Sequence, residues 1–130
     1  MRLLLDTHVW LWMLSTPERL NGATQAALAD PSNELWLSVA SAWEAAIKHA
    51  RGKLPLSEPV PALVQTTIEK LNVSVLPIGL GHALASATLP PHHNDPFDRL
   101  LVAQARAEGL TLVTGDELVS RYGATVMWAV

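Results

Sequence analysis

Short apolar runs alternate along the chain with longer segments of helical periodicity, and this alternation limits the fold more than any other feature. Apolar runs of this length suit buried strands, and helix-length segments between them form the crossovers that parallel strands need. The order predicts an α/β fold with a central, mainly parallel β-sheet flanked by helices. The expected strands are residues 2–6, 34–39, 73–78 and 110–115, with a possible edge strand at 125–130.

The segments between the expected strands carry helix signals at their ends. Asp95 and Pro96 suit the start of a helix, and Gly52 and Gly109 stand where a glycine ends one. Ser41 with an acid three residues later fits a capping box. The expected helices are residues 8–14, 17–30, 41–54, 63–71, 79–89 and 97–109.

Composition narrows the class of protein further. The 130 residues are 49% hydrophobic and 16% charged, which favours a single packed domain over residues 1–130. The lack of cysteine excludes disulfides, thiolate metal sites and a cysteine nucleophile, and it suits a reducing cytoplasm. We expect no membrane segment, because no run approaches the ~18 apolar residues that a span needs. A net charge of −3 means that any nucleic-acid partner must be drawn to a local site.

Four acidic residues share a position at the expected strand ends. Asp6 ends the first strand, and Asp116 follows the fourth strand through "TGD". Glu44 and Asp98 fall in the expected first turns of two helices, and helices that follow a strand begin at this same edge. Sites in open parallel sheets form outside the carboxyl ends of the strands. We therefore expect the four carboxylates to converge there.

Such a cluster of carboxylates predicts a metal site. Like charges in one pocket raise each other's pKa, and a divalent cation relieves that repulsion. Oxygen ligands without cysteine favour Mg²⁺ or Mn²⁺, and one or two such ions suit phosphodiester hydrolysis by a metal-activated water. In the alternative interpretation each acid has a structural role: Glu44 completes the capping box, Asp116 caps a short helix at 117–122, Asp6 is a turn residue, and Asp98 faces the positive end of its helix.

Four stretches resemble, in order and spacing, the PIN-domain toxins of bacterial VapBC toxin–antitoxin pairs: "LLLDTH", "SAWEAAIKHARGKL", "HNDPFDRLLVAQA" and "LVTGDELVSRYG". The resemblance covers nearly the whole chain and implies a PIN-like fold, with the family's metal-binding acids on Asp6, Glu44, Asp98 and Asp116. It implies a Mg²⁺- or Mn²⁺-dependent endoribonuclease that cuts structured RNA, often tRNA or rRNA. It also implies a homodimer and a cognate VapB-like antitoxin whose tail blocks the acidic site.

Other residues near these motifs are secondary candidates. Asp95 belongs to the "DPFDR" variant of the third motif and suits a cap better than a ligand. Thr114 could orient the following aspartate or a water through its hydroxyl. Lys48 and Arg51 share a stripe with the preceding glutamate, so they could hold RNA phosphates. Equally, Lys48 could form an i,i+4 ion pair, and cations suit the end of a helix.

We expect the histidine, arginine and tryptophan side chains near the motifs to have structural rather than catalytic roles. His92 and His93 are adjacent in a loop and lack metal-binding partners in sequence, so we expect them on the surface. We expect Arg99 to face the solvent or to pair with an acid. The five tryptophans fit core or dimer contacts better than platforms for stacking bases.

Two other functions are compatible with acids at strand ends. A Mg²⁺-dependent aspartyl phosphatase or receiver domain would use an aspartate after a strand. Against it, "DTH" lacks the second acid of a DxD phosphatase, and the fourth strand ends without the lysine of a receiver. A non-catalytic module could instead use the acids to bind a basic partner peptide.

Overall fold

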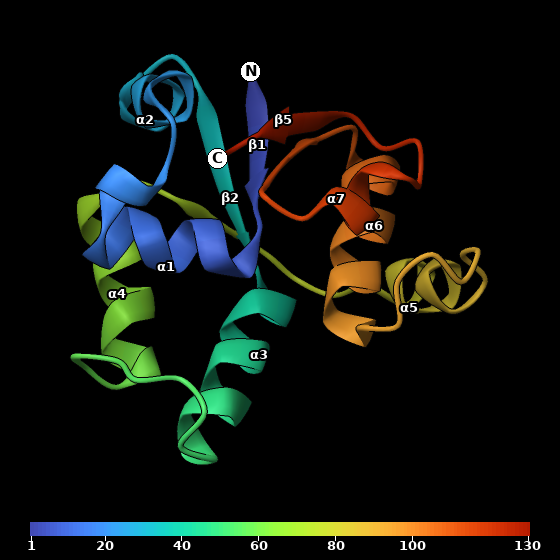
Figure 1. The fold of residues 1–130 in the computed structure, drawn as a ribbon, viewed down its shortest axis with the longest axis horizontal. Coiled ribbons are helices and arrows are strands. Elements are labelled where there is room, and N and C mark those ends of the chain that lie inside the picture. The colour runs from blue at the N-terminus through green and yellow to red at the C-terminus, as the bar shows by residue number, and fades with distance from the viewer.

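A five-stranded sheet forms the centre of the protein, whose residues 1–130 are described by a computed structural model (Figure 1). The strand order is β3-β2-β1-β4-β5, and every neighbouring pair is parallel. The α/β prediction is therefore confirmed, and the last strand lies at an edge as expected. The strands are β1 (Arg2–Leu5), β2 (Glu34–Ser38), β3 (Ser74–Leu76), β4 (Thr111–Thr114) and β5 (Val126–Trp128).

Helices cover both faces of this sheet. In Figure 1, α1, α2 and α4 lie on one side, and α5, α6 and α7 lie on the other, while α3 extends beyond the end of β2. None of the helices has the length and apolar character that crossing a membrane requires. The helices are α1 (Thr7–Ser15), the 3-10 turn η1 (Pro17–Arg19), α2 (Gly22–Ala29), α3 (Val39–Ala50), α4 (Val60–Lys70), α5 (Leu80–Ala87), α6 (Pro96–Glu108) and α7 (Glu117–Ser120).

The central strand β1 supplies side chains to two hydrophobic cores. Leu3 and Leu5 pack with Trp10 of α1 on one face of the sheet. Leu4 points the other way and packs with Leu101 of α6. Successive residues of a strand face opposite sides, so a strand buried on both faces is an uninterrupted apolar run. This explains why the segment Arg2–Leu5 carries three leucines in a row.

Local capping sets the boundaries of α6. The Asp95 side chain accepts hydrogen bonds from the backbone N–H groups of Phe97 and Asp98, at 2.8 and 3.4 Å. Pro96 occupies the first turn, where its missing N–H costs nothing. Gly109 ends the helix in the left-handed conformation, with φ 65°. The predicted start and end of this helix are confirmed.

Three other helix starts differ from the predictions. Residues 17–30 divide into η1 and α2 because the Asn21 side chain caps α2 at Thr24 N. Helix α4 begins at Val60, inside the proline-rich segment, since proline is tolerated in a first turn. The prediction of a capping box at Ser41 is wrong, because Ser38 at the end of β2 caps α3 instead.

Candidate active site

Asp6 leaves β1 at the carboxyl edge of the sheet and is buried, with 5% of its surface exposed. Its Oδ1 accepts the backbone N–H of His8 at 3.1 Å, so it caps α1. Its Oδ2 accepts the Thr114 hydroxyl at 2.6 Å. Burial raises the pKa of Asp6, and the hydrogen bonds from Thr114 and His8 oppose that rise.

Thr114 connects two of the acids. Its hydroxyl donates to Asp6 and accepts the backbone N–H of Asp116 at 3.0 Å. Asp116 in turn caps α7 by accepting the backbone N–H of Leu118 at 2.9 Å. Thr114 thus orients the side chain of Asp6, whereas it holds only the backbone of Asp116.

Glu44 is the most buried acid of the site, with 2% of its surface exposed. It lies in the second turn of α3, so its expected place in the first turn is wrong because the helix begins at Val39. Its Oε1 accepts the Thr7 hydroxyl at 2.7 Å, and its Oε2 pairs with the Lys48 ammonium. The hydrogen bond to Glu44 raises the pKa of Lys48. The ion pair expected between i and i+4 is therefore present.

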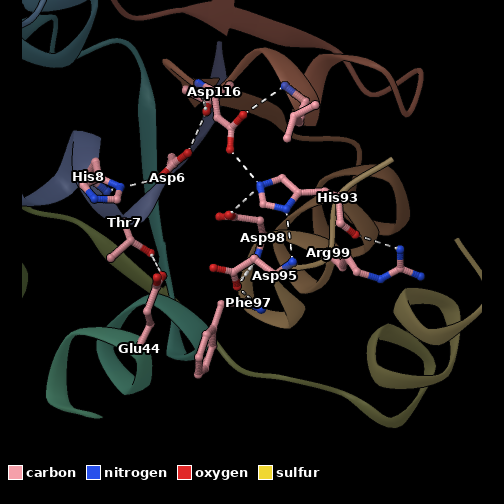
Figure 2. Close-up of polar contacts among 12 residues, drawn as sticks. Asp6, Thr7, His8, Glu44, His93, Asp95, Phe97, Asp98, Arg99 and Asp116 are labelled. Atoms are coloured by element: carbon pink, nitrogen blue, oxygen red, sulfur yellow. Dashed lines mark hydrogen bonds and ion pairs between the residues drawn. The ribbon is translucent and has the colours of Figure 1, made fainter. Parts of the chain in front are cut away.

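Asp98 is the point at which the four acids meet. Its pKa rises to about 8, first because it is buried and then because Asp6, Asp95, Glu44 and Asp116 each contribute negative charge. Figure 2 shows the carboxylates of Asp6, Glu44, Asp98 and Asp116 arranged around one space. The structure thus brings together the four acids that the sequence places at the strand ends.

His93 is a residue of the site that the sequence analysis missed. Its Nε2 lies 2.8 Å from Asp116 Oδ2 and 3.0 Å from Asp98 Oδ2, and its side chain is only 14% exposed. The expected surface position is correct for His92, which packs edge-on against Tyr122, but is wrong for His93. The only sequence signal was its place two residues before the cap of α6.

Arg99 was expected in solvent or beside an acid; it is half-buried and pairs with no acid. Its guanidinium lies over the loop before α6, where it donates to oxygen atoms of the chain. These acceptors are the backbone carbonyls of Ser86, Leu89, Pro90 and His93 and the hydroxyl of Tyr122. Arg99 therefore holds the loop that carries His93 (Figure 2).

The secondary candidates take different places. The Asp95 carboxylate is used to cap α6, although its charge acts on Asp98 and Lys48. Lys48 reaches the acids, whereas Arg51 is exposed at the end of α3. Arg51 lies roughly 10 Å farther than Glu44 along the helix axis. Of the two basic candidates, only Lys48 belongs to the cluster.

The donor set of this cluster fits a hard divalent cation. Four carboxylates supply oxygen ligands, and burial together with the neighbouring acids raises the pKa of Asp98, so the pocket favours an added positive charge. One oxygen each of Asp98 and Asp116 lies within 4.8 Å of the other and of the His93 ring nitrogen. A divalent ion would supply the missing charge, and Asp98 would release its proton when the ion binds.

Comparisons with known proteins identify the family. The sequence profile of the PIN domain matches residues 3–124. The chain is 33% identical over 114 residues to Ribonuclease VapC22 of Mycobacterium tuberculosis, and the match covers 87% of this chain and 85% of that protein. This chain belongs to the PIN-domain family. The resemblance drawn from the four sequence motifs is therefore confirmed, and the match to Ribonuclease VapC22 shows that this PIN domain is similar to the VapC proteins.

Solved structures share the PIN-domain architecture. VapBC2 from Rickettsia felis, bound to a DNA fragment from its promoter, matches with a TM-score of 0.74 and 15% identity over 100% of both chains. DNA-bound VapBC from Salmonella typhimurium matches with a TM-score of 0.71 and 18% identity, over 98% of this chain and 97% of that one. At these identities the likeness shows a common fold.

Proposed function

We propose that this PIN-domain protein is a metal-dependent endoribonuclease toxin of a type II toxin–antitoxin pair. The observation that carries the proposal is the cluster of Asp6, Glu44, Asp98 and Asp116. Burial, followed by the charges of the neighbouring acids, raises the pKa of Asp98 to about 8. Membership of the PIN-domain family and the match to Ribonuclease VapC22 support RNA as the substrate.

Asp6, Glu44, Asp98 and Asp116 would hold one or two Mg²⁺ or Mn²⁺ ions. When bound, such ions supply a water of lowered pKa and offset the negative charge of the phosphodiester. The chain contributes the orientation of the carboxylates, because the Thr114 hydroxyl fixes Asp6 and the Thr7 hydroxyl fixes Glu44. These hydrogen bonds hold the oxygens in place before substrate arrives, which reduces reorganisation during the reaction.

The substrate and the partners follow from the charge of the site. Lys48 is the cation nearest the acids and would contact an RNA phosphate there, whereas Arg51 would contact the RNA outside the site. A VapB-like antitoxin would inhibit by placing a basic side chain among the carboxylates. A homodimer and a cytoplasmic location, where tRNA and rRNA are present, belong to the same proposal.

An aspartyl phosphatase or receiver is less compatible with the geometry of Asp6. A nucleophilic aspartate needs an oxygen that can reach phosphorus. Both oxygens of Asp6 accept hydrogen bonds, and the residue is almost completely buried. Asp6 therefore suits metal binding better than attack on a phosphate.

Cleavage assays with the purified full chain test the proposal. We expect RNA cleavage with Mg²⁺ or Mn²⁺, none in EDTA, and products with 5′-phosphate ends, as attack by water requires. Asp6→Asn and Glu44→Gln should abolish both cleavage and growth arrest on expression. Glu69→Gln is the control, because Glu69 is an exposed acid of α4 away from the cluster. Cyclic phosphate ends produced in EDTA would contradict the proposal.

A further inference from the structure

We infer that His93 positions Asp116, next to Asp98, as a hydrogen-bond donor and is not itself a metal ligand. The inference rests on the proposed metal-dependent function and assigns a role to a residue outside the four acids. Three features support it: the tautomer of the ring, the partners of its Nε2, and the way the loop is held (Figure 2).

The backbone of Asp95 fixes the tautomer of His93. The Asp95 N–H group points at His93 Nδ1, with 3.1 Å between the two nitrogens. A backbone N–H can only donate, so Nδ1 must present its lone pair and the ring hydrogen must lie on Nε2. A ligating histidine needs the opposite arrangement, with the metal on one nitrogen and a hydrogen on the other. The local geometry therefore favours a donor.

The Nε2–H group faces two carboxylates from different elements. Asp98 belongs to α6, and Asp116 belongs to the turn between β4 and α7. The hydrogen bond of this Nε2–H group is to Asp116 Oδ2, and Asp98 Oδ2 lies 3.0 Å from the same nitrogen. Each carboxylate oxygen has two lone pairs, so a cation and His93 can share one carboxylate. His93 thus fixes the rotation of Asp116, lies beside Asp98, and leaves acceptor positions for an ion on both carboxylates.

Hydrogen bonds with Tyr122 and Arg99 hold the backbone of His93 in place. Tyr122 accepts the backbone N–H of His93 through its hydroxyl at 2.7 Å. Arg99 donates to the His93 carbonyl at 3.2 Å and to three further carbonyls, one at the end of α5 and two in the loop that follows it. A guanidinium offers five donors in one rigid plane, which a lysine cannot reproduce. Arg99 is therefore a positioning residue that acts through His93.

The tautomer can be measured directly on the ¹⁵N-labelled full chain. Long-range ¹H–¹⁵N correlation spectra distinguish a hydrogen on Nδ1 from one on Nε2. We expect the Nε2–H form of His93 in EDTA, and we expect Mg²⁺ to leave it unchanged. A hydrogen on Nδ1, or loss of the Nε2 hydrogen when Mg²⁺ is added, would overturn the inference.

Two substitutions separate donation from ligation and from simple packing. His93→Gln retains an N–H near the position of Nε2, whereas His93→Leu keeps similar bulk without a donor. By isothermal titration with Mn²⁺, we expect His93→Leu to bind about 10- to 100-fold more weakly, as for outer-shell partners generally, and His93→Gln to recover most of the loss. The control is His92→Leu, a histidine of the same loop that contacts no acid. Equal losses in both His93 variants, or tighter binding by His93→Leu, would refute a donor role.

Arg99→Lys tests the support separately. We expect Arg99→Lys to bind Mn²⁺ as weakly as His93→Leu does. The double variant Arg99→Lys/His93→Leu should bind no more weakly than either single variant, because both changes remove the same positioning effect. Additive losses would show that Arg99 does not act through His93. These measurements need no RNA: if the wild type binds Mn²⁺ but does not cleave, the proposed function fails and the role of His93 stands. If the wild type binds no Mn²⁺, both fail.

Discussion

Replacing Asp98 by asparagine should change how the metal-free protein responds to pH. Burial and the neighbouring acids raise the pKa of Asp98 from its ordinary 3.8 to about 8 in the folded state. Between these two values the folded chain keeps the proton, while the unfolded chain releases it. The folded state binds more protons, so the free energy of unfolding falls as pH rises through this window and levels off above it.

The size of the effect follows from the two pKa values. They differ by about four units, and each unit corresponds to about 1.4 kcal/mol, which gives an upper limit on the order of 6 kcal/mol. Urea unfolding in EDTA, followed by circular dichroism from pH 4 to pH 9, measures this difference. We expect Asp98→Asn to match the wild type at the acid end and to be several kcal/mol more stable at the alkaline end.

Magnesium provides the internal control for this experiment. Saturating Mg²⁺ should remove the fall in stability of the wild type and should have little effect on Asp98→Asn, because the cation replaces the proton. Glu69→Gln, on the outer surface of α4, should follow the wild-type curve. Parallel pH curves for the wild type and Asp98→Asn would refute the argument that the acids crowd Asp98.

Three further changes test separate contacts. Asp95→Ser keeps a side-chain acceptor for α6, so the free energy of unfolding in urea should fall by less than about 1 kcal/mol. The Mn²⁺ affinity should stay within about threefold of the wild type. A 100-fold loss of affinity would make Asp95 a ligand. Lys48→Gln removes the charge paired with Glu44, so calorimetry should show tighter Mn²⁺ binding while KM for RNA rises; weaker Mn²⁺ binding would contradict this. Gly109→Ala places a side chain at φ 65° and should lower the free energy of unfolding by about 1 kcal/mol, and an unchanged urea midpoint would disprove the strain.

Local sequence rules predict those parts of the fold that depend on neighbouring residues. Asp95, Pro96 and Gly109 mark the boundaries of α6 correctly because each acts on backbone groups within a few positions. Ser38 and Ser41 are both suitable caps, and local rules do not choose between them. The choice is made by the end of β2, whose pairing with β1 stops at Leu37 and whose pairing with β3 stops at Ser38.

The site is predictable only in part for the same reason. The positions of Asp6 and Asp116 follow from the parallel sheet, because strand ends meet at one edge. His93 and Arg99 depend on a loop whose path is set by contacts with Tyr122 and with carbonyls far along the chain. No periodicity encodes such contacts. The inward turn of His93 therefore becomes visible only in three dimensions.

The location of Asp6 beside the middle strand has a consequence for how the protein can be switched off. Its backbone N–H donates to Val113 O at 3.0 Å, and β1 is held between β2 and β4. Amides next to core strands are among the more protected in a domain. Fraying of a peripheral segment is therefore an inefficient way to displace this carboxylate. An inhibitor that acts on Asp6 itself must therefore fill the space in front of it.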